Sequence, residues 1–280
     1  MVAALLIAGS ASHPRGQGVD YLSGQNIAPV FEGWERQPDG SYDFIFGYFN
    51  RNLEEHFYLP VGPENRFESG PADRGQPTFF YPRRSWFVFR INVPADFGDQ
   101  EMVWTLTTNG KTETATASLR IEYELDDTVI YHTNSGLVMT EETARNLAPT
   151  LQVEGGAERS VSVGDRLQLA AVTTDDGIPS PRPAPRRVGF LTAMGLRLSW
   201  FVYRGDGHAV TFDPKQFKAY WDSRSNSPWT PGWQAPPLPD DGRLEVAATF
   251  SQPGDYVLRA MAHDGAFDTT RDITVRVSPR

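Results

Sequence analysis

The chain has 280 residues, 39% of them hydrophobic, and a formal net charge of -9 at pH 7. This length suits two domains of ordinary size, and an acidic chain without a basic patch disfavours the nucleic-acid phosphate backbone as a partner. The absence of cysteine excludes disulfides, thiolate catalysis and cysteine-ligated metals. With 22 prolines, 25 glycines and 12% aromatic residues, the composition favours short strands and turns over long helices.

The first 29 residues are predicted to be a signal-like and extended leader. Residues 2–12 are apolar and end in small residues, with Ser10 and Ser12 spaced for cleavage, although a basic n-region is missing. The run is too short to cross a bilayer, and no other run approaches the ~20 residues a spanning helix needs. We therefore expect an exported protein, periplasmic or extracellular; a short strand or a membrane-surface tether are the alternatives for this run.

Residues 30–122 are predicted to form a first β-sandwich. The sequence Asn109-Gly110 between two alternating segments is a strong hairpin signal, because Asn-Gly readily adopts a type I′ turn. Strict alternation along the aromatic stretch 83–90 buries Trp86 and Val88 and turns Phe87 and Phe89 to the other face, which the second domain or a partner would cover. The other strands are expected at residues 30–35, 42–49, 56–61, 78–81 and 86–93.

Residues 123–149 differ in pattern and are interpreted as a connector. An acidic run is followed by a polar segment, and then by Thr140 and two glutamates. Thr140 is a suitable N-cap, and acidic residues favour the first turn of a helix. A short helix is therefore expected to begin near Thr140.

Residues 150–280 are predicted to form a second β-sandwich. After the turn at Pro253-Gly254, residues 256–262 alternate along one strand, and Tyr256 occupies the position of a tyrosine corner. Leu258 stands where antibody domains place a cysteine, so packing alone must join the two sheets. The remaining strands are expected at residues 151–153, 159–163, 166–173, 197–203, 209–212, 243–250 and 272–277.

The second domain resembles bacterial extracellular Ig-like domains of the PKD type, whereas the first is only generically similar to Ig and fibronectin-III domains. The resemblance rests on residues 161–170, 173–179, 198–202, 210–212 and 248–265 standing in the family's order. It implies that Trp200 packs in the core beneath Tyr256. It also implies adhesion, spacing or docking as the function, with neither Trp200 nor Tyr256 catalytic.

A long insertion at residues 213–242 is the first candidate for a partner-binding site. Loops of this length are functional or disordered more often than not, and disordered segments are usually poor in aromatic residues. Trp and Tyr anchors dominate many protein interfaces. The alternative is that the aromatic residues fold back as a lid over the sandwich or the first domain. The candidate residues are Phe217, Tyr220, Trp221, Trp229 and Trp233.

A second insertion, residues 180–195, is a proline-rich arm. Arg182, Arg186 and Arg187 lead into an apolar patch that contains Phe190. In an acidic chain these arginines suit an acidic protein surface or lipid headgroups. The alternative is a solvated loop in which the arginines balance nearby aspartates.

Catalytic and metal-binding motifs are not evident. The five histidines are dispersed, and the common hydrolase and nucleotide motifs are absent. Paired carboxylates at 126–127, 175–176 and 240–241 lie in turn-like contexts, where bonds to the local backbone account for them. Calcium is the one inorganic ligand considered, at Asp175, Asp176, Asp264 and Asp268, but no EF-hand spacing supports it, and no metal or cofactor is predicted.

Taken together, these features predict an all-β chain of two tandem Ig-like sandwiches without enzymatic activity. We expect an exported accessory subunit that docks onto protein subunits of a larger assembly, peripheral to a membrane and not spanning it. Photosynthetic reaction-centre assemblies are one such setting. The alternatives are a carbohydrate-binding or adhesion module, and an enzyme with unrecognised carboxylate chemistry; the sequence does not distinguish a glycan platform from a protein interface.

Overall fold

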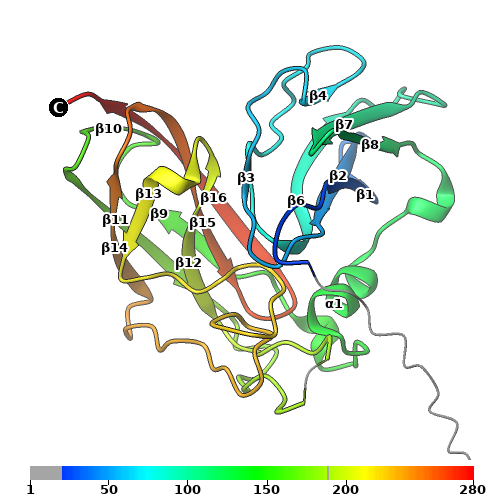
Figure 1. The fold of residues 1–280 in the computed structure, drawn as a ribbon. Helices are drawn as coiled ribbons and strands as arrows, with labels where there is room; N and C mark the ends of the chain where they lie inside the picture. The colour runs from blue at the N-terminus through cyan, green and yellow to red at the C-terminus, as the bar shows by residue number, and fades with distance from the viewer. Residues whose placement is uncertain (1–20, 188) are drawn as a thin grey trace, which may run out of the picture.

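The protein is a two-domain all-β chain, as the sequence predicts. The structure, a computed structural model, describes residues 21–187 and 189–280. The two groups of sheets lie side by side, with one short α-helix in the connector between them (Figure 1). The signal-like segment at residues 2–12 lies outside the described residues.

The first domain is built from two three-stranded sheets and a two-stranded ribbon. The strand orders are β1-β2-β6, β4-β7-β8 and β3-β5. Its core is dominated by stacked and edge-to-face aromatic rings, among them Phe46, Phe89 and Trp104. The strands are β1 (Ile27–Arg36), β2 (Tyr42–Asn50), β3 (Phe57–Tyr58), β4 (Asn65–Phe67), β5 (Phe79–Phe80), β6 (Arg83–Val93), β7 (Met102–Thr108) and β8 (Lys111–Ala117).

The predicted hairpin is confirmed. Strands β7 and β8 pair antiparallel from Met102↔Ala117 to Thr108↔Lys111, which leaves Asn109 and Gly110 as the two turn residues. Both have positive φ angles, 50° and 73°, as a type I′ turn requires.

The connector contains an α-helix that the sequence analysis missed. Helix α1 (Asp127–Ser135) begins earlier than the helix expected near Thr140. The Asp126 side chain accepts a hydrogen bond from the N–H of Val129, and Gly136 ends the helix in the left-handed conformation. Thr140, where a helix was expected, precedes only a 3₁₀ turn, η2 (Thr143–Arg145). Two further 3₁₀ turns lie elsewhere in the chain: η1 (Ile121–Tyr123) and η3 (Gly207–Ala209).

The second domain is a sandwich of two four-stranded sheets, β10-β16-β15-β12 and β13-β14-β11-β9. Strands β10 and β16 pair parallel, and every other pair is antiparallel. The strands are β9 (Thr150–Val153), β10 (Glu158–Ser162), β11 (Arg166–Thr174), β12 (Arg197–Arg204), β13 (Val210–Asp213), β14 (Arg243–Phe250), β15 (Gly254–His263) and β16 (Asp268–Ser278).

The tyrosine corner of the second domain is present. The hydroxyl of Tyr256 donates a 3.0 Å hydrogen bond to the carbonyl of Gln252, four residues upstream. Tyr256 and Trp200 are both buried in the same core, as the sequence predicts, together with Leu258.

The two domains are joined by a shared segment, residues 72–81. Phe79 belongs to the first domain but is buried in the core of the second, whereas Tyr203 of β12 is buried in the core of the first. The Thr78 N–H donates to the Tyr203 carbonyl (3.1 Å), and Arg204 pairs with Asp73 (2.6 Å). Because side chains and backbone both cross the boundary, the two sandwiches form one interlocked unit.

Candidate functional site

The outer face of the sheet β10-β16-β15-β12 is the first component of the site. Cross-strand register places Arg197, His263 and Asp268 in one row, and Phe201, Arg259 and Asp272 in another. Alternate residues of the same strands, such as Trp200 and Leu258, point into the sandwich core. This outer face is polar, which is ordinary for a solvated sheet. Here the first domain covers the part around Arg259, whereas Asp255 and Arg276, farther along the same face, stay exposed.

The covering surface comes from β5, β6 and the residues between them. The guanidinium of Arg259 is bidentate to Asp272 (2.7 and 2.8 Å) and donates across the domain boundary to the carbonyl of Val88 (2.7 Å). It also lies over the ring of Tyr203, 3.6 Å from the centroid. These contacts hold β6 above the polar face of the second domain.

A bulge in β6 reverses the predicted alternation of its aromatic residues. The pairing with β2 shifts between Phe46↔Phe89 and Tyr48↔Ser85, and Phe87 has a positive φ of 51°. Phe89 is therefore buried in the first core, whereas Trp86 lies half-buried beside the second domain, the opposite of the expectation. The expected covering of one side of this strand by the second domain is confirmed.

The insertion 213–242, drawn in yellow to orange in Figure 1, closes one side of this interdomain space. Phe217, Tyr220 and Trp229 are buried. The ring of Tyr220 stacks on Tyr81 at 5.4 Å, and Trp229 lies 6.3 Å from Trp86. These three side chains thus adopt the lid arrangement that the sequence left open as the alternative to docking.

A buried ion cluster holds the insertion in shape. Asp222, only 2% exposed, accepts bonds from Lys218 (2.6 Å) and Arg224 (3.2 Å). Burial opposes ionisation, yet the hydrogen bonds from Lys218 and Arg224 keep the pKa of Asp222 below its ordinary value. Arg224 also donates to the carbonyl of Leu53 (2.8 Å), which ties the insertion to the first domain.

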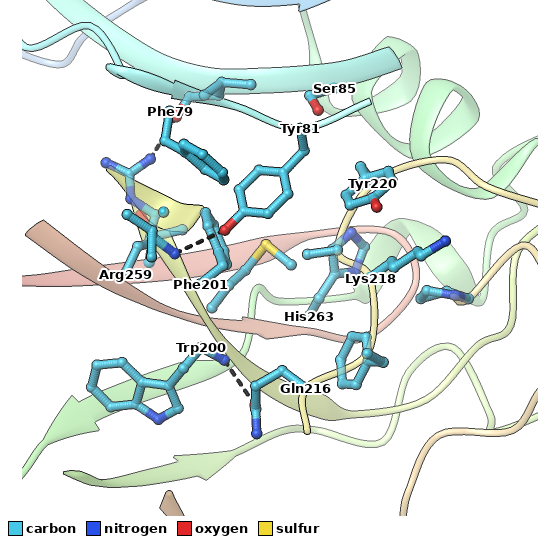
Figure 2. Close-up of a pocket in the computed structure, with 18 of the residues that line it drawn as sticks. Phe79, Tyr81, Ser85, Trp200, Phe201, Gln216, Lys218, Tyr220, Arg259 and His263 are labelled. Atoms are coloured by element: carbon cyan, nitrogen blue, oxygen red, sulfur yellow. Dashed lines mark hydrogen bonds between the residues drawn. The ribbon is translucent and has the colours of Figure 1, made fainter. Parts of the chain in front are cut away.

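The outer face of β12, β15 and β16 forms the floor of a partly open cavity of about 640 Å³, which the covering strand β6 and the insertion also line. Figure 2 shows Tyr81, Tyr220 and Ser85 on one side of this space, with Trp200, Gln216 and His263 across from them. Sites for small molecules commonly have this size and this mixture of aromatic walls with a few polar groups. The sequence does not predict this small-molecule site.

Several polar groups at the cavity have no hydrogen-bond partner among the described residues. The Asp268 side chain, partly open to the cavity, makes no hydrogen bond there, nor does the Tyr220 hydroxyl, and the Nε of the buried Arg197 is unpaired. Burial raises the pKa of Asp268 and lowers that of Arg197 to about 10. The floor therefore carries hydrogen-bonding capacity that the protein itself does not use.

The other predicted partner-binding residues lie on the outside. Phe190 is 76% exposed, and Arg182, Arg186 and Arg187 are exposed, whereas Trp221 and Trp233 are half-buried. The Phe190 ring stacks on Trp221 (6.5 Å, 25°), and the Arg83 guanidinium lies over Trp221 at 4.7 Å. We call Phe190, Trp221 and the three arm arginines the arm cluster. Two backbone bonds, Ala184 N–H to the Trp233 carbonyl and Ala193 N–H to that of Pro228, join the arm to the insertion.

Three of the four acidic residues considered for calcium, all but Asp268, accept hydrogen bonds within the protein. Asp264 accepts bonds from Asn146 and two backbone N–H groups, and Asp176 accepts from Leu147 and Ile178. Asp268 lies apart from them on the cavity floor. No group of three or more His, Asp or Glu that could hold a metal ion occurs in residues 21–187 and 189–280. Burial, with Asp264 and Asp176 nearby, raises the pKa of Asp175 to about 6.

The residues that form the cavity are not predicted from the sequence. Tyr81, Phe201, Arg259 and Asp268 come from three strands and a turn that only the folded chain brings together. His56 and His208, dispersed in sequence, meet there with ring centroids 6.1 Å apart. One usable signal was present: Arg259, Met261 and His263 alternate with core residues, and Met261 is unusual on a solvated face.

Comparisons with known proteins add no assignment of function. No protein-family model matches the chain, and no curated protein matches its sequence. The chain is similar to domains 4 and 5 of the S-layer protein SbsC at 9% identity and a TM-score of 0.26, over 64% of this chain and 65% of that one. It is also similar to titin domains Z1Z2 in complex with telethonin (12% identity, TM-score 0.23, 90% of this chain and 98% of that one).

A third similar structure is the PKD domain of an M14-like peptidase from Thermoplasmatales archaeon SCGC AB-540-F20. The identity is 15% and the TM-score 0.25, over 48% of this chain and 96% of that one. The chain's own sheets define the class of protein: two tandem Ig-like β-sandwiches. Among the described residues, no helix is both long and apolar enough to cross a membrane.

Proposed function

We propose that the protein is a non-catalytic, exported accessory subunit that docks onto an acidic surface of a larger, membrane-associated assembly through the arm cluster. The observation that carries this proposal is the position of Phe190. Its ring is 76% exposed, yet it is stacked on Trp221, and three exposed arginines precede it. An aromatic anchor beside arginines is the composition of interface hot spots.

The charge of the chain supports an acidic partner. The arm cluster concentrates Arg182, Arg186 and Arg187 on a protein whose net charge is -9. An acidic partner would be attracted to this cluster and repelled by most of the remaining surface, which gives orientation as well as affinity. Arg is also favoured over Lys at interfaces because its planar guanidinium binds carboxylates bidentately.

The interlocked domains support a scaffolding function. Phe79 and Tyr203 each lie in the core of the other domain, so that the arm cluster sits on a body in which the two domains do not move independently. A pre-organised surface lowers the entropic cost of association. On the residue pattern given above, we further propose that the second domain is of the PKD type.

A glycan-binding surface module is less well supported. Such a module needs an open row of aromatic rings, whereas Phe217, Tyr220 and Trp229 are turned inward. The catalytic alternative lacks a pair of carboxylates converging in the cavity, since Asp268 is the only carboxylate among the residues that line it in the described part of the chain.

The test is a pull-down of the tagged protein from its native membranes in mild detergent. The arm variant Arg186→Glu/Arg187→Glu/Phe190→Ser is compared with Arg271→Glu/Arg276→Glu, which reverses two exposed charges on β16. A photo-crosslinking residue at position 190 identifies the contacted peptide. We expect a stoichiometric partner that the β16 variant retains and the arm variant loses, with the crosslink in an Asp/Glu-rich segment. Equal capture by the arm variant, or no partner, contradicts the proposal.

A further inference from the structure

The interdomain cavity has two chemically different sides. The floor, on β12, β15 and β16, presents hydrogen-bonding side chains such as His263 and Asp268, whereas the covering side presents aromatic rings such as Tyr81 and Tyr220. A ligand that satisfies both sides must be amphipathic, with one apolar face and several hydrogen-bonding groups. The volume of about 640 Å³ limits it to the size of a small molecule.

The charges around the cavity are balanced. Arg84, Lys218 and Arg259 are paired with Glu32, Asp222 and Asp272. Of the remaining lining residues, Arg197 lies near the carboxyls of Asp264 and Asp268, Asp268 lies near Arg90, Arg259 and Arg197, and Lys215 is exposed to solvent. A charged ligand would bring an uncompensated charge into this partly open space between the domains, at a desolvation cost. The balance therefore favours a neutral ligand.

The polar groups of the cavity that lack a hydrogen-bond partner include both donors and acceptors. The Asp268 carboxylate accepts no hydrogen bond from the described residues, and the Tyr220 hydroxyl has no partner among them. The Tyr81 oxygen accepts from the N–H of Val202, so its own proton is left to donate. Hydroxyl groups both donate and accept, and a set of them would satisfy this mixture without a net charge.

We propose that this cavity binds a neutral sugar of one or two rings. The apolar face of the ring packs against the aromatic side of the cavity, and its hydroxyls bind Asp268, Tyr81 and Tyr220. The smaller pocket of about 420 Å³ shares His56, Lys218 and Tyr220 with the cavity, and in this proposal a second ring of the sugar lies there. This inference is independent of the docking proposal, because the arm cluster is not part of the cavity.

The experiment is isothermal titration calorimetry of the full chain with neutral sugars. The probes are glucose, galactose, mannose, N-acetylglucosamine, cellobiose, maltose and lactose, each to about 10 mM, so that a Kd near 1 mM is detected. Glucuronate, glucosamine and tyramine serve as charged probes. We expect at least one neutral sugar to bind with 1:1 stoichiometry, and the charged probes to bind at least about tenfold more weakly.

Two matched variants locate the binding. Asp268→Asn keeps the shape but removes the carboxylate, and should lower the affinity at least about tenfold; Asp255→Asn, an exposed carboxylate on β15, should leave it unchanged. Thermal unfolding without sugar checks that both variants fold. No binding by any neutral sugar, preferred binding of a charged probe, or equal affinity in the folded Asp268→Asn variant overturns the proposal.

Discussion

The phenol oxygen of Tyr81, in the first domain, accepts a 2.9 Å hydrogen bond from the backbone N–H of Val202, in the second. Val202 lies on β12, an edge strand, and the next outward N–H, that of Trp200, donates to Gln216 of the insertion. Exposed strand edges promote aggregation, and proteins protect them by covering them. The first domain and the insertion thus supply hydrogen-bond acceptors to the outward N–H groups of β12, as a neighbouring strand would.

Replacing Tyr81 by Phe should therefore destabilise the protein. The variant keeps the ring but leaves the buried Val202 N–H without an acceptor, at a cost of about 1 to 3 kcal/mol in the free energy of unfolding. Urea denaturation measures it. Tyr58→Phe is the control, because Tyr58 is exposed and its hydroxyl makes no hydrogen bond among the described residues. Equal stability of the two variants would show that the bond contributes nothing.

The contact between Gly207 and Phe79 offers a second test of how the two domains are interlocked. A Cβ added at Gly207 would lie 2.5 Å from the Phe79 ring, which enters the second core from the first domain. Gly207→Ala should cost about 1 to 3 kcal/mol by overpacking. The cost should shrink in a Phe79→Leu background, since the double mutant relieves the clash.

The control for this cycle is Gly189→Ala, because a Cβ there meets no atom within 4 Å. It should be nearly neutral. An unchanged cost of Gly207→Ala in the Phe79→Leu background would mean that Phe79 does not occupy the second core in solution.

The sequence predicted those features that depend on neighbouring residues alone. Alternation placed Trp200 and Tyr256 in the second core, and Asn109-Gly110 located a hairpin. The bulge in β6 was not predictable from alternation, because it depends on a contact distant in sequence: a Cβ at Gly47 would lie 2.5 Å from the Ser85 carbonyl.

The cavity also could not be predicted from neighbouring residues in the sequence. Its floor residues, such as Arg259 and Asp268, occupy strand positions that a solvated sheet would also fill with polar side chains. Only the packing of the first domain turns this face into a partly enclosed site. The aromatic insertion did give a signal, but sequence alone left open whether Tyr220 and Trp229 point outward or inward.

The ion pair between Arg259 and Asp272 should contribute more than a surface pair on the same two strands. Arg259 is largely buried and also donates to the Val88 carbonyl, whereas Arg276 and Asp255 are exposed and 3.4 Å apart. Arg259→Leu should lower the free energy of unfolding by about 2 to 3 kcal/mol, since hydrogen bonds of a charged group are lost. Arg276→Leu should cost less than about 1 kcal/mol. Similar losses in both variants would contradict a bridging role for Arg259 between the domains.

Acid sensitivity should depend on His263, which is buried in the row with Arg197 and Asp268. Burial first, and the nearby Arg197 second, lower the pKa of His263 well below its ordinary value. Its Nδ1 also accepts a 2.8 Å bond from the Gly265 N–H, which the neutral ring alone can do. The unfolded chain therefore takes up a proton below about pH 6.5 that the folded protein does not, so stability is lost as the pH falls through that value.

His263→Asn removes the titrating ring and retains an acceptor near the Nδ1 position. From pH 6.5 to 5.5 the wild type should lose about 1 kcal/mol more stability than this variant, because one group contributes up to about 1.4 kcal/mol per pH unit. Partly buried carboxyls such as Asp175, whose pKa desolvation raises to about 6, act in the opposite direction, but they are common to both proteins. Urea titrations at pH 7.5, 6.5 and 5.5 measure the difference, with His132→Asn as control, because the His132 side chain on α1 is exposed. Parallel stability curves for wild type and His263→Asn would show that His263 is not held neutral in the folded protein.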